Sequence, residues 1–334
     1  MTEGPGTLRL GSRKSPMAIA QSGDVARLLT ERTGRRVEIV GVTTLGDVSK
    51  EHLTQIGGTG VFVSGVRDAL LRGEVDFAVH SLKDLPTGGA PGIALAAIPA
   101  RDDPRDALVA RDGAKLADLP AGARIGTGSP RRAAQLTLLR SDVTCVPIRG
   151  NANTRLAKVR DRELDAVVLA YAGLARIGHT DLVSEIFEPE DMVPAPGQGA
   201  LAVECAAGDT ELAELLATID HPATRAAVTA ERSLLAALEA GCSAPVGAYA
   251  VATGVNRLHL EGVVLGVPAA SFSPAALDSA PGSGRIVIRE RGEADAADAA
   301  SLGRELAERM LALGAAGLMR GERLSQTDGD GNET

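Results

Sequence analysis

The chain has 334 residues, a formal net charge of −8 and 44% hydrophobic residues, which is the length and composition of a globular protein with two or three domains. The negative charge and the 2% aromatic content argue against nucleic-acid binding, which usually needs a basic face and aromatic rings for base stacking. No apolar run approaches the roughly 18 residues that span a bilayer, so we do not expect a membrane protein.

The amino terminus and the cysteines indicate the cellular compartment of the protein. The amino terminus lacks a basic region followed by an apolar stretch, so we expect no secretory signal and predict a cytoplasmic protein. Cys145, Cys205 and Cys242 are too few and too scattered for a disulfide framework or a metal-binding CxxC pair. We therefore expect no metal site, and any sulfur chemistry would come from a single thiol.

The first part of the chain has the alternation of strands and helices that is typical of an α/β sheet. Strands are predicted at 7–11, 36–42 and 75–79, with 91–98 and 105–110 continuing the sheet, and helices at 15–33 and 61–72. Residues 43–60 are polar and glycine-bearing without periodicity, which is typical of a mobile functional loop.

A second strand–helix series begins at residue 124. Ser129 is a candidate N-cap and Pro130 suits the first helical position, which predicts a helix to about Arg140. Further strands are predicted at 143–148 and 165–170, and helices at 154–162 and 171–176. The segment 193–205 is rich in proline and glycine and runs into a strand, so we interpret it as a return crossing between the two halves.

The last part of the chain predicts a different architecture. A long helix is expected from His221 to about Ala240, then antiparallel strands at 246–252, 257–265 and 285–290, and a helix near 295–314. Residues 267–283 are predicted to be an exposed insertion and 321–334 a disordered tail. The predicted fold class is α/β, with one domain from 1–99 and 200–220, a second from 100–199, and a small α+β domain with an antiparallel sheet from 221–320.

The segment HSLKDLP (80–86) follows a short apolar run, which is typical of a buried strand that opens into a loop. Ligands of open α/β sheets bind beyond the carboxyl ends of the strands. Asp84 beside Lys83 is a candidate acid/base pair, because a neighbouring cation favours the ionised carboxylate. The alternative is a solvated turn, which is what most such strand-end clusters are.

Three turns share one design: GSRKSP at 11–16, GTGSPRR at 126–132 and RGNANTR at 149–155. Each places glycine, a small polar residue and arginine between a strand and a helix, where free backbone N–H groups bind anions. Arginine adds a planar fork that matches a carboxylate or phosphate. One such arginine is commonly just solvated, but three turns in an acidic chain predict a polyanionic substrate. Carboxylates are favoured over a nucleotide, because the sequence has no GxxxxGKS/T motif.

Cys242 lies in EAGCSAPVG (239–247), at the end of the long predicted helix, where glycine and proline favour an exposed turn. Cys145 and Cys205 lie inside apolar strand patterns, where a free cysteine is ordinarily inert packing. Two interpretations of Cys242 stay open, a thiol with covalent chemistry and a small loop residue, because no neighbouring basic group that would lower its pKa can be located.

With these motifs in view, the chain resembles the porphobilinogen deaminase family, also called hydroxymethylbilane synthases. The resemblance covers about residues 7–315 and rests on motifs in a fixed order, which here read SRKSP, GDV, GGTGVF, AVHSLKDLP, RDDPRDA, GTGSPRRAAQL, RGNANTRL, DAVVLAYAGLARIG, PAPGQGALAVEC, TAERSLL and EAGCSAPVGAYA. It implies two α/β domains like those of type II periplasmic binding proteins, and a third domain that carries the cysteine on a loop. It also implies a monomer that acts on porphobilinogen in tetrapyrrole (haem) biosynthesis.

The resemblance implies a part for each matching residue. Cys242 would hold a dipyrromethane cofactor through a thioether, as the primer to which four porphobilinogen units are added with loss of ammonia. Asp84, with Lys83, would be the central acid/base and would stabilise positive charge that develops on the pyrrole ring. The cofactor would be bound by Ser81, Lys83, Asp84, Thr127, Ser129, Arg131, Arg132 and Gly150. The incoming substrate and growing chain would be bound by Arg13, Ser15, Arg149, Arg155 and Arg176.

The sequence departs from the family pattern around the 43–60 loop. The family's GGKG reads Gly57-Gly58-Thr59-Gly60 here, and its Lys-Glu after Phe62 is replaced by Ser64-Gly65, so a cationic contact of this loop is lost. Two other classes of function remain to be compared. A two-domain solute-binding protein for a polycarboxylate would share the arginine turns but needs no thiol. A redox protein using Cys242 would need a partner cysteine at suitable spacing, which the sequence lacks.

Overall fold

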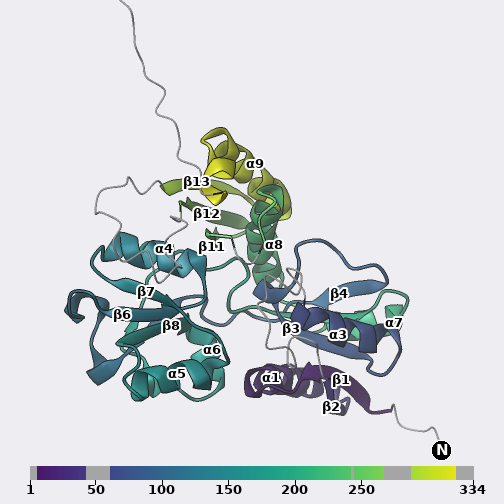
Figure 1. The fold of residues 1–334 in the computed structure, drawn as a ribbon. Coiled ribbons are helices and arrows are strands. Elements are labelled where there is room, and N and C mark those ends of the chain that lie inside the picture. The colour runs from purple at the N-terminus through teal and green to yellow at the C-terminus, as the bar shows by residue number, and fades with distance from the viewer. Residues whose placement is uncertain (1–5, 43–60, 242–243, 267–286, 321–334) are drawn as a thin grey trace, which may run out of the picture.

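The computed structural model describes residues 6–42, 61–241, 244–266 and 287–320. Over these ranges the chain forms two five-stranded mixed sheets, each with helices, and a three-stranded antiparallel sheet, which Figure 1 shows as three lobes. This is the predicted fold class. Within the described ranges, no helix is long and apolar enough to cross a membrane.

The first sheet has the strand order β2-β1-β3-β10-β4. Its strands are β1 (Leu8–Arg13), β2 (Val37–Val42), β3 (Phe77–Ser81), β4 (Ile93–Ala97) and β10 (Leu201–Ala206). β1 is parallel to both β2 and β3, whereas β10 runs antiparallel between β3 and β4. The helices against this sheet are α1 (Pro16–Thr33), α3 (Val61–Leu71) and α7 (Thr210–Ala217). The fully buried centre of this core is formed by Leu10, Leu29, Phe77, Val203 and Leu216.

Local cap chemistry sets the helix ends of this lobe. The Ser15 hydroxyl accepts a hydrogen bond from the Ala18 N–H at the start of α1, and Gly34 ends that helix with a left-handed φ of 71°. The pattern-based prediction misses α7, because eight residues show little more than two turns of helical periodicity. That helix is capped by Asp209, whose carboxylate accepts from the Leu212 N–H.

The second sheet has the order β7-β6-β8-β5-β9. Its strands are β5 (Asp106–Ala110), β6 (Arg124–Thr127), β7 (Thr144–Pro147), β8 (Ala166–Ala170) and the short β9 (Glu185–Ile186). Its helices are α4 (Pro130–Leu139), α5 (Ala152–Arg160) and α6 (Tyr171–Arg176). The N-cap predicted at Ser129 is confirmed, because its hydroxyl accepts from the Arg132 N–H.

Two segments cross between these sheets, 98–105 after β4 and 187–200 after β9. The expectation that 105–110 continues the first sheet is wrong, because the charged, proline-containing segment 98–105 carries the chain across and β5 pairs with β8. The predicted return crossing is confirmed, since β10 lies in the first sheet between β3 and β4.

The C-terminal lobe is a meander of β11 (Val246–Gly254), β12 (Arg257–Leu265) and β13 (Val287–Asp295). It packs against α8 (Pro222–Ala237), α9 (Ala299–Ala312) and α10 (Ala315–Met319). α8 and α9 approach closely at Gly303, where a β-carbon would lie 2.3 Å from the Ala230 carbonyl oxygen.

Three predicted boundaries in this lobe are wrong. The last strand extends to Asp295, where it pairs with Arg257, because the alternation of charged residues continues past 290. The following helix therefore begins only at Ala299. α8 ends at Ala237, since Glu239 takes a left-handed φ of 51°. The expectations for the 43–60 loop, the 267–283 insertion and the 321–334 tail fall outside the described residues.

Candidate active site

The turn after β3 is held at its start by the buried Leu82 and exposes Asp84. The chain leaves β3 at Ser81, itself half-buried, and makes one 3₁₀ turn over Leu82–Asp84. Leu82 is fully buried, and its N–H donates to the Ala200 carbonyl at 3.0 Å. Lys83 is half-buried and Asp84 is exposed. The structure therefore presents both groups beyond the carboxyl end of β3, the position that the sequence predicts.

Each of the first two arginine turns supplies one serine hydroxyl that caps the helix after it. Ser15 and Ser129 cap α1 and α4, and the hydroxyl of the fully buried Thr127 accepts from the Ser129 N–H at 3.2 Å. A serine that accepts at a cap still has its own hydrogen to donate to a ligand. Arg13, the last residue of β1, is half-buried at the same sheet edge as the turn after β3.

The third turn leads from β7 into α5. Gly150 has a φ of 99°, and a β-carbon there would lie 2.9 Å from the Thr154 side chain, so the turn requires glycine. Arg149 is exposed, and the half-buried Arg155 donates from Nε to the Gly150 carbonyl at 2.9 Å. Burial and the charge of Arg132 lower the pKa of Arg155, while the charge of Asp84 opposes that change. Charges from both sheets therefore act on Arg155.

Arg131 and Arg132 converge on a carboxylate that the sequence analysis does not assign. Asp106, the first residue of β5, is fully buried. It accepts from Arg131 Nη2 at 2.7 Å, Arg132 Nε at 2.9 Å and Gln198 Nε2 at 2.8 Å. Burial alone would raise the pKa of Asp106, but the two guanidinium groups hold it well below its usual range. One carboxylate thus faces two buried cations, which leaves an excess of positive charge.

Gln198 connects this cluster to the turn after β3. Its side-chain oxygen accepts from Lys83 Nζ at 3.1 Å and from Arg132 Nη2 at 3.3 Å. Burial, and then the charge of Arg132, lowers the pKa of Lys83 to about 8, although Asp84 and Asp106 oppose the shift. The structure therefore brings Lys83 and Asp84 of the first sheet close to Arg132 and Arg155 of the second.

Arg176 is placed differently. It ends α6, donates from Nη2 to the Gly199 carbonyl at 2.9 Å and pairs with Asp102 at 2.5 Å. Asp102 and Gly199 belong to the two crossing segments. The structure therefore ties Arg176 to the connection between the sheets, apart from the hydrogen bonds around Asp106.

Asp106 and Gln198 were not predicted as site residues from the sequence, although they lie in the motifs RDDPRDA and PAPGQGALAVEC. Asp106 stands directly before the apolar run ALVA, and Gln198 is the polar side chain in PAPGQGALA. A polar residue inside such a segment is buried with a partner when the segment packs, and this is the signal that would have identified them.

The three thiols differ in their setting. Cys145 lies in β7, where burial raises its pKa to about 12. Cys205 is fully buried in β10, and its pKa is also raised, mainly by burial. Neither is poised as a nucleophile. Cys242, the predicted attachment point, lies outside the described residues.

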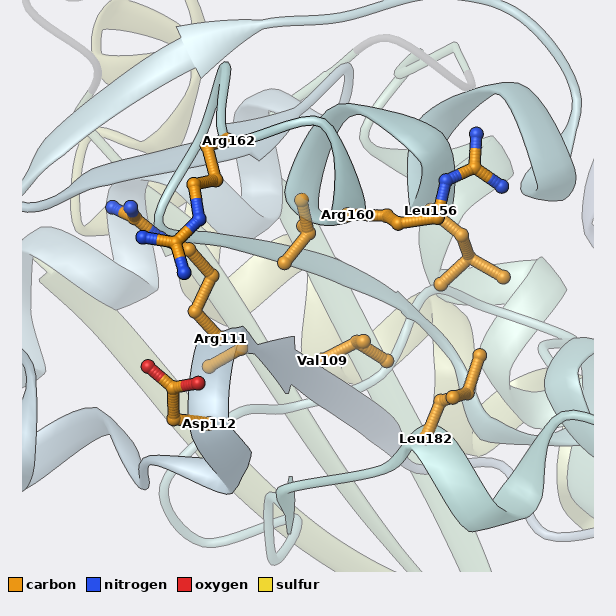
Figure 2. Close-up of a pocket in the computed structure, with 9 residues that line it drawn as sticks. Val109, Arg111, Asp112, Leu156, Arg160, Arg162 and Leu182 are labelled. Carbon is orange, nitrogen blue, oxygen red and sulfur yellow. The ribbon is translucent and has the colours of Figure 1, made fainter.

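A separate hollow of about 270 Å³ lies at the opposite end of the second sheet (Figure 2). Asp106 pairs with Ala170 at the site end of β5, whereas this hollow begins at Val109 and Ala110 at the other end. Figure 2 shows Arg111 and Arg162 extending toward one another at its rim. Arg111 pairs with Asp165 and Arg160 pairs with Asp161, so much of the positive charge around the hollow is already neutralised. Of the predicted site residues that the structure describes, none lines this hollow.

The fold and the site define a class: an α/β protein in which an exposed carboxylate stands among half-buried and buried cations that suit a polycarboxylate ligand. The comparisons with known proteins narrow this class. Residues 8–214 match the family described as porphobilinogen deaminase, dipyromethane cofactor binding domain, and residues 225–271 match its C-terminal domain. The chain is 58% identical to porphobilinogen deaminase 1 of Streptomyces coelicolor, over 95% of this chain and 98% of that protein. It is 57% identical to porphobilinogen deaminase of Thermobifida fusca, over 92% of this chain and 94% of that protein.

The chain belongs to the porphobilinogen deaminase family, and its activity is that of the family, a transferase of tetrapyrrole biosynthesis with a domain for the dipyrromethane cofactor. Among solved structures, it is similar to a periplasmic substrate-binding protein of an ABC transporter from Coxiella burnetii. The TM-score is 0.41 at 15% identity, over 66% of this chain and 94% of that chain. A likeness of that size carries no argument about the ligand.

Proposed function

We propose that this chain condenses four porphobilinogen molecules, with loss of ammonia, into the linear tetrapyrrole hydroxymethylbilane, which it then releases by hydrolysis. The observation that carries the proposal is the exposed Asp84 carboxylate, close to Lys83 and Arg155, with Arg132 beside them. An exposed carboxylate among cations suits a substrate that has carboxylate arms and develops positive charge on its ring.

The residues present fit a dipyrromethane with acetate and propionate arms. Lys83, Arg131, Arg132 and Arg155 outnumber the carboxylates of Asp84 and Asp106. Arg131 Nε is also buried without a hydrogen-bond partner among the described residues, and an unpaired buried donor favours an anionic group nearby. When bound to Cys242, the dipyrromethane supplies a covalent primer for chain growth. We propose that it is held by Ser81, Lys83, Asp84, Thr127, Ser129, Arg131, Arg132 and Gly150.

Asp84 and Lys83 have complementary tasks in this proposal. The Asp84 carboxylate accepts hydrogen bonds from pyrrole N–H groups, stabilises positive charge on the ring and exchanges a proton as ammonia leaves. With a pKa of about 8, the Lys83 ammonium can give up a proton near neutral pH. Both groups stand on one turn, so the distance between them changes little as the chain grows.

The incoming substrate and the growing chain need further carboxylate partners. We propose Arg13, Ser15, Arg149, Arg155 and Arg176 for this part. Burial and the charge of Arg132 lower the pKa of Arg155, which means that they disfavour its charged form. A carboxylate bound to Arg155 would stabilise that charged form. Arg176 has a buried Nε without a hydrogen-bond partner among the described residues, so it retains a donor beyond its contacts with the crossing segments.

The same proposal includes the setting of the enzyme. We place the domain divisions at 1–99 with 200–220, 100–199, and 221–320, because each of these ranges contains one of the three sheets. We further propose a cytoplasmic monomer whose partner is the small molecule porphobilinogen.

The test is to incubate the purified protein with porphobilinogen and to measure ammonia, hydroxymethylbilane and the intact mass of the protein. We expect one ammonia per porphobilinogen consumed and a resting mass that includes one dipyrromethane. Tight binding of porphobilinogen with neither ammonia nor product would instead indicate a solute-binding protein for polycarboxylates.

A further inference from the structure

One side chain of α8 holds the turn that carries Lys83 and Asp84. Arg232 Nη1 donates to the carbonyl oxygens of Leu82 at 3.2 Å and Leu85 at 3.1 Å. Arg232 Nη2 donates to the Pro86 carbonyl at 2.7 Å. Three carbonyl groups that flank the acid/base pair therefore converge on a single guanidinium group from the C-terminal lobe.

The same face of α8 also packs under this turn. Val228 lies one helical turn before Arg232, is fully buried, and shares an apolar cluster with Leu82 and Leu85. The second crossing closes the other side, since a β-carbon on Gly197 would lie 3.2 Å from the Leu82 side chain. The backbone of the turn is thus fixed from two sides while Asp84 stays exposed.

The chemistry of the contact favours arginine. Carbonyl dipoles that point toward one spot repel each other unless a donor lies between them, and a half-buried carbonyl without a donor costs free energy. A guanidinium group has a rigid planar fork of donors, whereas a lysine ammonium is a compact point charge on a flexible stem. Without Arg232, the Leu82 carbonyl keeps the Leu85 N–H as a donor, but the carbonyl groups of Leu85 and Pro86 lose the guanidinium group. Rotation of these carbonyl groups toward water would move Lys83 and Asp84.

We infer that Arg232 is a positioning residue for the reaction: it holds the turn so that the Asp84 carboxylate keeps its place relative to the substrate ring. The helix that carries it ends at Ala237, before Cys242 in the sequence. The inference rests on the proposed function through the role given to Asp84.

The experiment compares Arg232→Gln and Arg232→Lys with a matched control on the same helix. Arg225→Gln is that control, because Arg225 pairs with Asp220 and the Ala96 carbonyl, away from the turn. We expect Arg232→Gln to lower kcat by roughly tenfold to a hundredfold, since a displacement near 1 Å has about that effect. KM and the fraction of protein that carries the cofactor should stay within about twofold of wild type. Arg232→Lys should recover part of kcat, and Arg225→Gln should keep the wild-type kcat.

A second measurement separates positioning from general destabilisation. If Arg232 acts through Asp84, the Arg232→Gln loss should be at least about fivefold smaller in the Asp84→Glu background, where the carboxylate is already displaced. Equal losses in both backgrounds, or a wild-type kcat in folded Arg232→Gln, would overturn the inference. Should Arg232→Gln not fold, the same cycle is run with Arg232→Lys. Failure of the proposed function is recognised separately, because wild-type protein would then form no hydroxymethylbilane.

Discussion

The Lys83 ammonium donates a hydrogen bond of 3.1 Å to the side-chain oxygen of Gln198, which joins the turn after β3 to the segment that returns from the second sheet. The amide nitrogen of the same glutamine donates to Asp106 at 2.8 Å. One amide therefore connects the turn that carries Lys83 and Asp84 to the carboxylate that binds Arg131 and Arg132. The charges of Asp106, Arg131 and Arg132 therefore act on the pKa of Lys83.

The first prediction concerns pH. The pKa of Lys83 is lowered to about 8 by burial and by Arg132, and a bound carboxylate would raise it, so binding above pH 8 must take up a proton. We expect kcat/KM for porphobilinogen to fall as pH rises from 8 to 10, by up to about tenfold per unit. Initial rates at constant ionic strength measure this. Lys83→Met should be less active at pH 7 and should lack this fall; a wild-type profile that stays flat to pH 10 contradicts the prediction.

The second prediction concerns stability. Asp106→Leu would leave the guanidinium groups of Arg131 and Arg132 buried without their carboxylate, and breaking a buried pair in this way costs about 3–5 kcal/mol. Urea denaturation should show a loss of that size in the free energy of unfolding. The control is Asp142→Ala, which removes the exposed partner of Arg140 and should cost less than about 1 kcal/mol. Equal losses in the two variants would show that the Asp106 cluster adds nothing beyond a surface pair.

The third prediction separates the arginines by task. Arg131→Leu and Arg132→Leu should yield protein with little or no dipyrromethane. Leucine at Arg13, Arg149, Arg155 or Arg176 should yield loaded protein that stalls during chain growth, because a carboxylate arm loses its charged partner. Native mass spectrometry after addition of porphobilinogen distinguishes apo protein from stalled adducts. Full elongation by all six variants would refute the polycarboxylate interpretation of these turns.

The fourth prediction concerns the attachment point. Cys242→Ser should remove the mass increment of the cofactor and abolish turnover. Cys145 and Cys205 are poor alternatives, because burial raises the pKa of each thiol and little thiolate is present at neutral pH. Peptide mapping of the active protein locates the adduct. An adduct on Cys145 or Cys205, or active protein without any adduct, contradicts the assignment. The cofactor should also raise the Tm, since a group held only by the folded state stabilises it.

The fifth prediction tests Asp84 itself. Asp84→Glu keeps the charge but displaces it by about one methylene, so we expect retained cofactor and a loss of roughly a hundredfold in rate. Asp84→Asn keeps the shape without the charge or the transferable proton, so turnover should nearly vanish. Hydroxymethylbilane formation is measured after folding and cofactor content are shown to be equal. Near-normal activity of Asp84→Asn would mean that Asp84 only shapes the turn.

Much of the local structure follows from the sequence alone. The caps at Ser15 and Ser129, the glycine turn at Gly150 and the presentation of Asp84 after β3 depend on residues within a few positions of one another. Cap chemistry, glycine conformation and apolar periodicity are properties of such short segments. The fold class and the position of the candidate acid/base pair were therefore predictable. The ends of β13 and α8 were not predicted. β13 continues to Asp295 through residues that are mostly charged and lack the apolar alternation of a typical strand. α8 ends before Glu239, whose left-handed backbone the apolar periodicity of the helix does not indicate.

The partners of the site residues were decided by the tertiary structure. Asp106 meets Arg131 because β5 lies antiparallel beside β8 in the second sheet, and Gln198 reaches Lys83 because the return crossing passes the turn after β3. Arg232 reaches the same turn from α8, which comes after the strands of both sheets in the sequence. A hydrogen bond or ion pair forms wherever folding brings two groups within about 3 Å, and separation along the chain does not affect it. No pattern of nearby residues therefore contains these pairings, which arise only when strand order and crossing segments set the distances in space.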